Sequence, residues 1–181
     1  TLKYASGYNL TQLFIGSEGT LGIITKIVVK LIPKPMHDVL ILASFTSNEQ
    51  ACSTVSAIFN AGIVPSAVEF MERKGVAWVM KYDHIAFDLK QEAEAFLLIE
   101  LDGNNLDTLI NESEKLNQVL ENNECIDVLF ADAAAQKEEL WRMRRIMAVS
   151  VKANSIYKEE DTVVPRAALP KLISGIKQIG T

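Results

Sequence analysis

The sequence predicts an α+β fold with a ferredoxin-like antiparallel sheet and helices on one face of that sheet. From residue 38 onward, apolar runs of strand length alternate with segments of helical period, in the order β-α-β-α-β-α-β-α. No glycine-rich phosphate loop follows a strand in this part, which argues against a parallel nucleotide-binding sheet. The 49% hydrophobic and 23% charged content is typical of a soluble globular protein.

The N-terminal part is predicted to end in a strand. Residues 23–32, IITKIVVKLI, are rich in Ile and Val, which favour strands. The prolines in PKP at 33–35 end this run, because proline cannot donate to a strand ladder. We therefore place a domain boundary here, between residues 1–35 and 36–181.

The elements after the boundary follow from hydrophobic period and turn residues. Ser47 and Gly62 are the predicted caps of the first helix, and Asp132 is the predicted N-cap of a long later one. Residues 83–90 read as a loop or a helix extension, and TVVP at 162–165 as a short extended piece. The predicted strands are 38–45, 65–72, 94–103 and 126–131, and the predicted helices are 48–61, 73–82, 105–121, 133–152 and 167–179.

Charge and cysteine content exclude some classes of function. The net charge of −5 argues against a nucleic-acid partner, and no apolar run approaches the roughly 20 residues of a membrane helix. Cys52 and Cys125 lie far apart in apolar surroundings, so they indicate reduced core residues, against a disulfide or a reactive thiol. We expect a cytoplasmic protein.

Three of the nine glycines fall within GSEGTLG at 16–22. Glycine permits positive φ and close approach, and a loop of this kind can align backbone N–H groups toward the polar edge of a ligand. The spacing G-x-x-G-x-x-G differs from the G-x-G-x-x-G of a dinucleotide turn. A tight turn without a ligand explains the glycines as well as a binding loop does.

The residues around these glycines resemble a known protein family. SGYNLTQLFIGSEGTLGIITKIVVKLIPKP resembles the end of the FAD-binding domain in FAD-linked oxidases of the vanillyl-alcohol oxidase type, among them glycolate oxidase and D-lactate and D-2-hydroxyglutarate dehydrogenases. SAVEFME, LLIELDG, ELWRMRR and EEDTVVPRAALPKL resemble landmarks of their substrate-side cap domain. The resemblance implies that 1–35 ends an FAD-binding domain, that 36–181 is an incomplete cap domain, and that the whole protein oxidises a D-2-hydroxy acid by hydride transfer to FAD.

The resemblance also implies site residues. For Glu18, one of the implied FAD contacts, a side chain bound to nearby loop amides explains the residue as well as contact with the flavin does. Arg144, in LWRMR, corresponds to an arginine that holds the substrate carboxylate, and Lys158 lies near a second carboxylate ligand of the family; by itself, an arginine in a charged helix is usually a solvated residue. The implied FAD contacts are Gly16, Ser17, Glu18, Gly19, Thr20, Gly22 and Ile23.

Two family segments are missing from this sequence. G-H-x-G-D-G-N-x-H and E-H-G supply a catalytic histidine and, in several members, ligands of a divalent metal; here the only histidines are His37 and His84, without ligand spacing. We therefore expect no catalytic residue and no metal ligand in this sequence. We also expect the sequence to be an internal piece of an enzyme, and this piece by itself to be inactive and not to retain FAD. The alternative is a non-catalytic α+β ligand-binding or assembly module. The electron acceptor (a quinone or a flavoprotein) and homo-oligomer formation stay open.

Overall fold

The computed structural model describes residues 6–84 and 88–179 of the chain. Its contacts divide the chain into two units, residues 1–34 and residues 35–181. Of the predicted loop at 83–90, residues 85–87 lie outside the described residues.

The first unit contains one short helix, α1 (Leu10–Phe14), followed by the glycine loop. The Asn9 side chain caps α1 by accepting a hydrogen bond from the Gln12 N–H at 3.2 Å. The strand predicted at 23–32 is wrong for this structure, because these residues are assigned to no helix or strand. Ile23 and Val28 are about nine-tenths exposed, so the run is apolar enough for a strand but has no partner to pair with among the described residues.

The second unit is built on a four-stranded antiparallel sheet, in the order β2-β3-β1-β4. The two central strands pair along their whole length, from His37 opposite Gly103 to Phe45 opposite Ala95. The α+β class and the antiparallel sheet of the prediction are therefore confirmed, and the strand order is that of the split β-α-β, ferredoxin-like motif. The strands are β1 (His37–Phe45), β2 (Ala67–Glu72), β3 (Ala95–Gly103) and β4 (Asp127–Ala131).

The helices begin and end close to the predicted positions, except in one place. Ser47 caps the first of them by accepting from the Gln50 N–H at 3.1 Å, and Gly62 follows its end with φ of 76°, so both predicted caps are confirmed. The helices of the second unit are α2 (Asn48–Asn60), α3 (Arg73–Asp83), α4 (Leu106–Asn122), α5 (Ala134–Arg145), α6 (Met147–Asn154) and α7 (Leu169–Ile179), with a 3-10 turn, η1 (Arg166–Ala168), before α7.

The exception is the long helix predicted at 133–152, which is two helices in the structure. α5 ends at Arg145 and α6 begins at Met147, because Ile146 leaves the helical region with ψ of 1°. The N-cap position of α5 is Ala133, with no side-chain hydrogen bond, so the predicted Asp132 cap is wrong. The break lets α6 pack against α3, where a Cβ added to Gly75 would lie 2.7 Å from Met147 Sδ.

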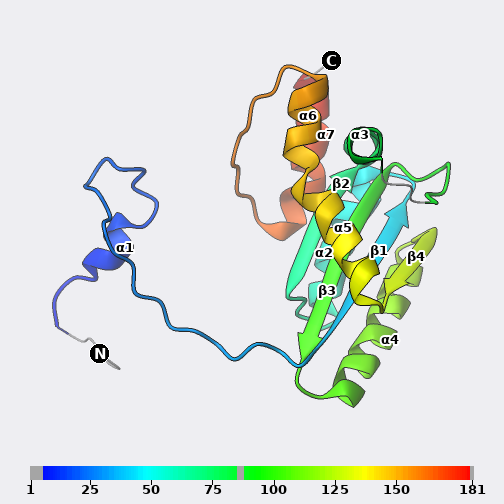
Figure 1. Cartoon of the computed structure of the whole chain (residues 1–181), viewed down its shortest axis with the longest axis horizontal. Helices are drawn as coiled ribbons and strands as arrows, with labels where there is room; N and C mark the ends of the chain where they lie inside the picture. Colours follow the sequence, from blue (N-terminus) through cyan, green and yellow to red (C-terminus); the bar gives the residue numbers. More distant parts are fainter. Residues whose placement is uncertain (1–5, 85–87, 180–181) are drawn as a thin grey trace. The chain divides into compact units, whose positions relative to one another are not determined.

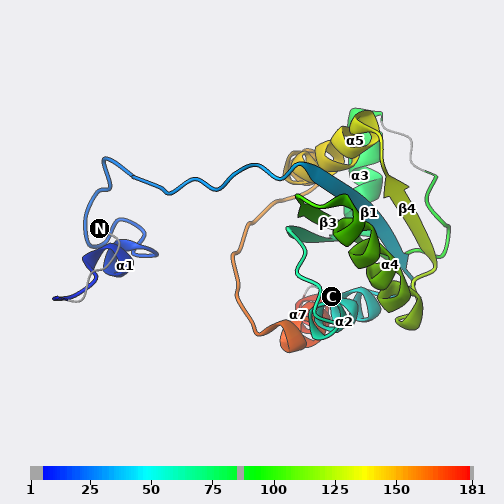
Figure 2. The ribbon, with the colours of Figure 1, turned by 90° about the horizontal axis from the view of Figure 1, so that it is seen from below.

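Helices cover both faces of the sheet, whereas the sequence predicted helices on one face only. Figures 1 and 2 show α2 and α4 on one side and α3 and α5 on the other. Alternate residues of β3 supply the two cores: Leu97 packs with residues of α2 and α4, and Leu98 with residues of α3 and α5. Both leucines are fully buried. The reason lies in the strands, which are apolar at almost every position and therefore need cover on both sides.

Within the part of the chain that the structure describes, no helix is both long enough and apolar enough to cross a membrane.

Candidate functional site

Arg144 occupies the last turn of α5, next to residues that anchor this helix in the core. Leu140 and Met143 are buried in the cluster shared with α3, so the backbone of α5 is fixed against the sheet. The Arg144 side chain is 39% exposed, and its Nε donates a hydrogen bond to Glu69 Oε2 at 2.7 Å. Among the described residues, no acceptor meets its two Nη groups. Arg144 thus keeps the end of its guanidinium fork for another acceptor.

Glu69 lies on β2, on the same face as Met71, because side chains of a strand alternate between faces. Met71 is buried against α3 and α5, whereas Glu69 is 34% exposed and reaches the end of α5. From the sequence, SAVEFME is predicted as part of the strand at 65–72 and as a family landmark, with no role for Glu69. The alternation of the strand was the available signal, because it places the Glu69 carboxylate on the same face as the buried Met71.

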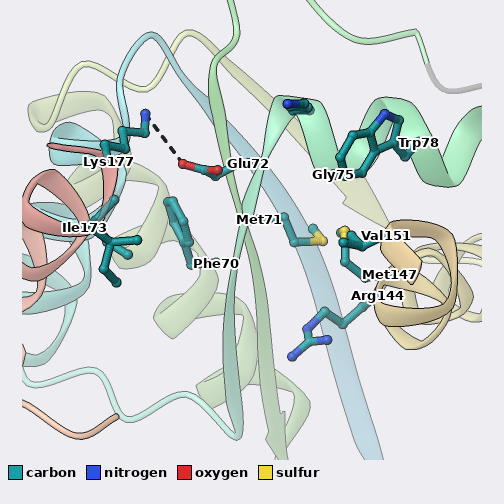
Figure 3. A pocket seen from close by; sticks show the side chains of 12 residues that line it. Phe70, Met71, Glu72, Gly75, Trp78, Arg144, Met147, Val151, Ile173 and Lys177 are labelled. Atoms are coloured by element: carbon teal, nitrogen blue, oxygen red, sulfur yellow. Dashed lines mark ion pairs between the residues drawn. The ribbon is translucent and has the colours of Figure 1, made fainter. Parts of the chain in front are cut away.

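Arg144 also lines a cavity of about 490 Å³ beside β2. Figure 3 shows Arg144, Met147 and Val151 on the α5–α6 side of this cavity and Ile173 and Lys177 on α7. Seven of its lining residues are apolar: Phe70, Met71, Trp78, Met147, Val151, Ile173 and Ile176. A guanidinium at the edge of an apolar cavity is suited to a small organic carboxylate.

The other charged groups of the cavity are already paired. Lys177 Nζ lies 3.5 Å from Glu72 Oε1, and the same carboxylate accepts a hydrogen bond from Asn48 Nδ2. Lys74 Nζ lies 5.1 Å from the centre of the Trp78 ring, a cation–π contact. Arg144 is therefore the cavity's cation with the most donors left over.

The two neighbouring arginines of α5 point elsewhere. Arg142 pairs with Asp83 at 2.7 Å, and Arg145 pairs with Glu138 on its own helix. Neither lines the cavity. Successive residues of a helix are rotated by about 100°, so the three guanidinium groups are directed to different surroundings.

Lys158 does not join Arg144 in the cavity. It lies between Ser155 and Pro165, in a segment without helix or strand, and pairs with Glu160 at 2.5 Å. Its side chain is 84% exposed, and the cavity lining does not include it. Its role as a second carboxylate ligand stays a prediction.

The glycine loop of the first unit uses its glycines in two ways. Gly16 and Gly19 have φ of 80° and 79°, a region that other residues rarely adopt. Gly22 instead permits a close approach, since a Cβ there would lie 2.7 Å from the Phe14 ring. Glu18 also has a positive φ, of 47°. The backbone of 16–22 is thus held in a shape that depends on its glycines.

This loop has the properties of a backbone binding surface. A hollow of about 490 Å³ is lined by residues of 14–19 and 22–24. Thr20 closes the turn, donating from N–H at 2.9 Å and from Oγ1 at 2.7 Å to the Ser17 carbonyl. In the described ranges, the N–H groups of Glu18, Gly19 and Gly22 have no backbone partner. Contact of this loop with a flavin stays a prediction of the resemblance.

Neither thiol is set up as a nucleophile. Cys52 is free and buried in α2, and burial raises its pKa to about 11. Cys125 is free and half-buried, and burial raises its pKa too. No three His, Cys, Asp or Glu side chains within 6–84 and 88–179 are grouped closely enough to hold a metal ion.

Known proteins resemble this chain in sequence and in fold. It is 34% identical over 182 residues to a D-lactate dehydrogenase of Anaerostipes hadrus. This alignment covers 98% of this chain and 38% of that protein. It is 34% identical over 178 residues to the glycolate oxidase subunit GlcD of Bacillus subtilis (strain 168), covering 98% of this chain and 37% of GlcD. The chain therefore spans just over a third of the length of these relatives.

A solved structure of alkyldihydroxyacetonephosphate synthase has the same fold, with a TM-score of 0.61 at 19% identity, over 98% of this chain and 38% of that one. Residues 34–181 match the family described as FAD linked oxidases, C-terminal domain. The match takes in the whole sheet, the cavity beside β2 and Arg144. This chain belongs to the FAD-linked oxidase family, whose C-terminal domain it carries.

Proposed function

We propose that this chain is part of a flavin-dependent oxidoreductase that oxidises a D-2-hydroxy acid to the 2-oxo acid. The observation that carries the proposal is Arg144, a guanidinium at the edge of an apolar cavity, held by Glu69 through Nε with both Nη groups left over. A relative named D-lactate dehydrogenase and one named glycolate oxidase subunit, at 34% identity, support the choice of substrate class.

Each part of the chain has a separate task in this proposal. Residues 1–35 end the FAD-binding domain, and Gly16, Ser17, Glu18, Gly19, Thr20, Gly22 and Ile23 contribute contacts to FAD, mostly through the backbone. When bound, FAD accepts the hydride that leaves C2 of the substrate. Residues 36–181 form the cap domain that holds the substrate.

Arg144 binds the carboxylate and thereby orients C2. Two parallel N–H···O bonds from the Nη groups fix both the position and the plane of a carboxylate, which one ammonium group cannot do. Apolar side chains line the cavity beside it, and a substrate that covers them would exclude water and so strengthen the ion pair. Oxidation transfers a hydride from C2 to the flavin and a proton from the hydroxyl group to a base, which in the family is a histidine of a segment that this sequence does not contain. Arg144 contributes by orienting the C2–H bond for the hydride transfer.

Arg144→Lys in the full-length protein that carries this sequence tests the proposal. Glycolate, D-lactate and D-2-hydroxyglutarate are the substrates to compare, with an artificial electron acceptor. A hydrogen bond to a charged group contributes on the order of 1.5–3 kcal/mol, so we expect kcat/KM to fall roughly ten- to hundredfold. The flavin spectrum and the melting temperature should stay as in the wild type.

Arg145→Lys is the matched control, because Arg145 is the next residue of the same helix and pairs with Glu138 instead. Its kinetics should be those of the wild type. Normal turnover of every substrate by Arg144→Lys would reject Arg144 as the carboxylate ligand. An absence of turnover by the wild-type protein with all three acids would favour the alternative, a binding or assembly module.

A further inference from the structure

We infer that Glu69 is a positioning residue: its carboxylate holds the Arg144 guanidinium so that the two Nη groups meet the substrate carboxylate. The inference rests on the proposed function and adds a residue to it. Glu69 lies on a different element from Arg144 and far from it in the sequence, and the fold brings the two together at 2.7 Å.

The backbones of both residues are fixed by the core. Glu69 is opposite Leu98 in the β2–β3 ladder, and the neighbouring Met71 is 3% exposed. Arg144 follows Met143, which is fully buried. The ion pair therefore joins two rigid elements. Its effect is to restrict the conformations of the two side chains that form it.

The important detail is that Glu69 binds Arg144 at Nε. An arginine side chain is long and flexible, and an exposed one samples many rotamers. The guanidinium is planar, so a bond at Nε fixes the plane in which both Nη groups lie. A carboxylate bound at the Nη end then arrives in a preset orientation, which lowers the ordering cost of binding.

Stability alone does not account for this pair. The two side chains are 39% and 34% exposed, and ion pairs of that exposure contribute little to the free energy of folding. Glu69 also places a negative charge near the substrate's own, which opposes binding. Positioning and charge therefore predict opposite effects when Glu69 is removed, and this makes the inference testable.

The experiment compares Glu69→Ala, Glu69→Gln and Glu69→Asp in the full-length protein. It measures kcat and KM for D-lactate and glycolate, the Kd of pyruvate from the flavin absorbance, and the melting temperature. Gln keeps an oxygen that accepts from Nε but has no charge, whereas Ala removes the acceptor and Asp withdraws it by one methylene. Glu138→Ala is the matched control, because Glu138 makes the corresponding bond to Arg145.

We expect Glu69→Ala to raise KM and the Kd of pyruvate by roughly tenfold or more, since misplacement of a binding group by about 1 Å can cost up to 10²-fold. Glu69→Gln should restore values close to the wild type, Glu69→Asp should fall between the two, and Glu138→Ala should change neither constant. The melting temperature should hold in all of them. Should Glu69→Ala not fold, Glu69→Asp gives the answer, and an unchanged KM in that variant overturns the inference.

Tighter pyruvate binding by both Glu69→Ala and Glu69→Gln would also overturn it, because charge repulsion would then dominate. Unchanged constants in Glu69→Ala, together with a damaged Arg144→Lys, would reject the inference and leave the proposed function standing. Unchanged constants in Glu69→Ala and Arg144→Lys alike would reject both.

Discussion

Leu98→Ala tests the finding that helices cover both faces of the sheet. Leu98 lies on β3, a central strand, and points to the face covered by α3 and α5. With helices on one face only, its side chain would be in contact with water and its loss would have little effect. In the structure it is fully buried, as Leu97 is on the opposite face.

The expected loss of stability follows from that burial. Replacing a buried leucine by alanine removes apolar contact and leaves a cavity, at about 2–5 kcal/mol in well-packed cores. For a unit of this size, each kcal/mol lowers the melting temperature by about 2–4 °C, so Leu98→Ala should melt roughly 4–20 °C below the wild type. Leu97→Ala should fall within the same range.

Urea unfolding of the 181-residue chain gives the free energy of unfolding and thermal unfolding gives the melting temperature, both followed by circular dichroism. Asp102→Ala is the control, because Asp102 is an exposed residue of the same strand and should stay within about 0.5 kcal/mol of the wild type. A loss below about 1 kcal/mol for Leu98→Ala, beside a full loss for Leu97→Ala, would show that the α3–α5 face is not a true core.

Two further predictions concern pH and backbone exchange. Burial raises the pKa of Cys52 from 9.0 to about 11, so its contribution to the free energy of unfolding is complete below pH 9 and is lost as the pH rises toward 11. Urea unfolding from neutral pH to pH 11 should show a steeper loss in the wild type than in Cys52→Ala, and equal slopes would contradict the assignment. Residues 23–32 make no ladder hydrogen bonds with the described residues, so their amides should exchange within seconds while those of β3 stay protected for hours; comparable protection would mean that the run is paired.

Hydrophobic period and cap residues were sufficient to predict most elements of the second unit. Ser47 and Gly62 located both ends of α2, because a side-chain acceptor and a positive φ are local requirements. The break at Ile146 had no such signal. Neither glycine nor proline stands there, and the helix ends so that α6 can pack on α3 beside Gly75, a tertiary requirement.

The site was predicted only in part for the same reason. Arg144 was chosen as a candidate from its sequence context, and its role stays a prediction. Glu69 could not be assigned to it, because their contact depends on where β2 lies in the sheet. The strand predicted at 23–32 shows the converse. Its composition favours a strand, yet a strand forms only where a second one offers hydrogen bonds.

The strand order also determines how this unit can fold. Among the described residues, β1 pairs only with β3 and β4, so its partners lie far along the chain. Sequence-distant pairings of this kind slow folding, because the chain must close large loops before the contacts stabilise it. During synthesis, β1 and the apolar residues of α2 must wait until β3 has left the ribosome. A chaperone that shields DVLILASF in that interval would raise the yield of folded protein, and a stall before residue 95 would leave a nascent chain prone to aggregation.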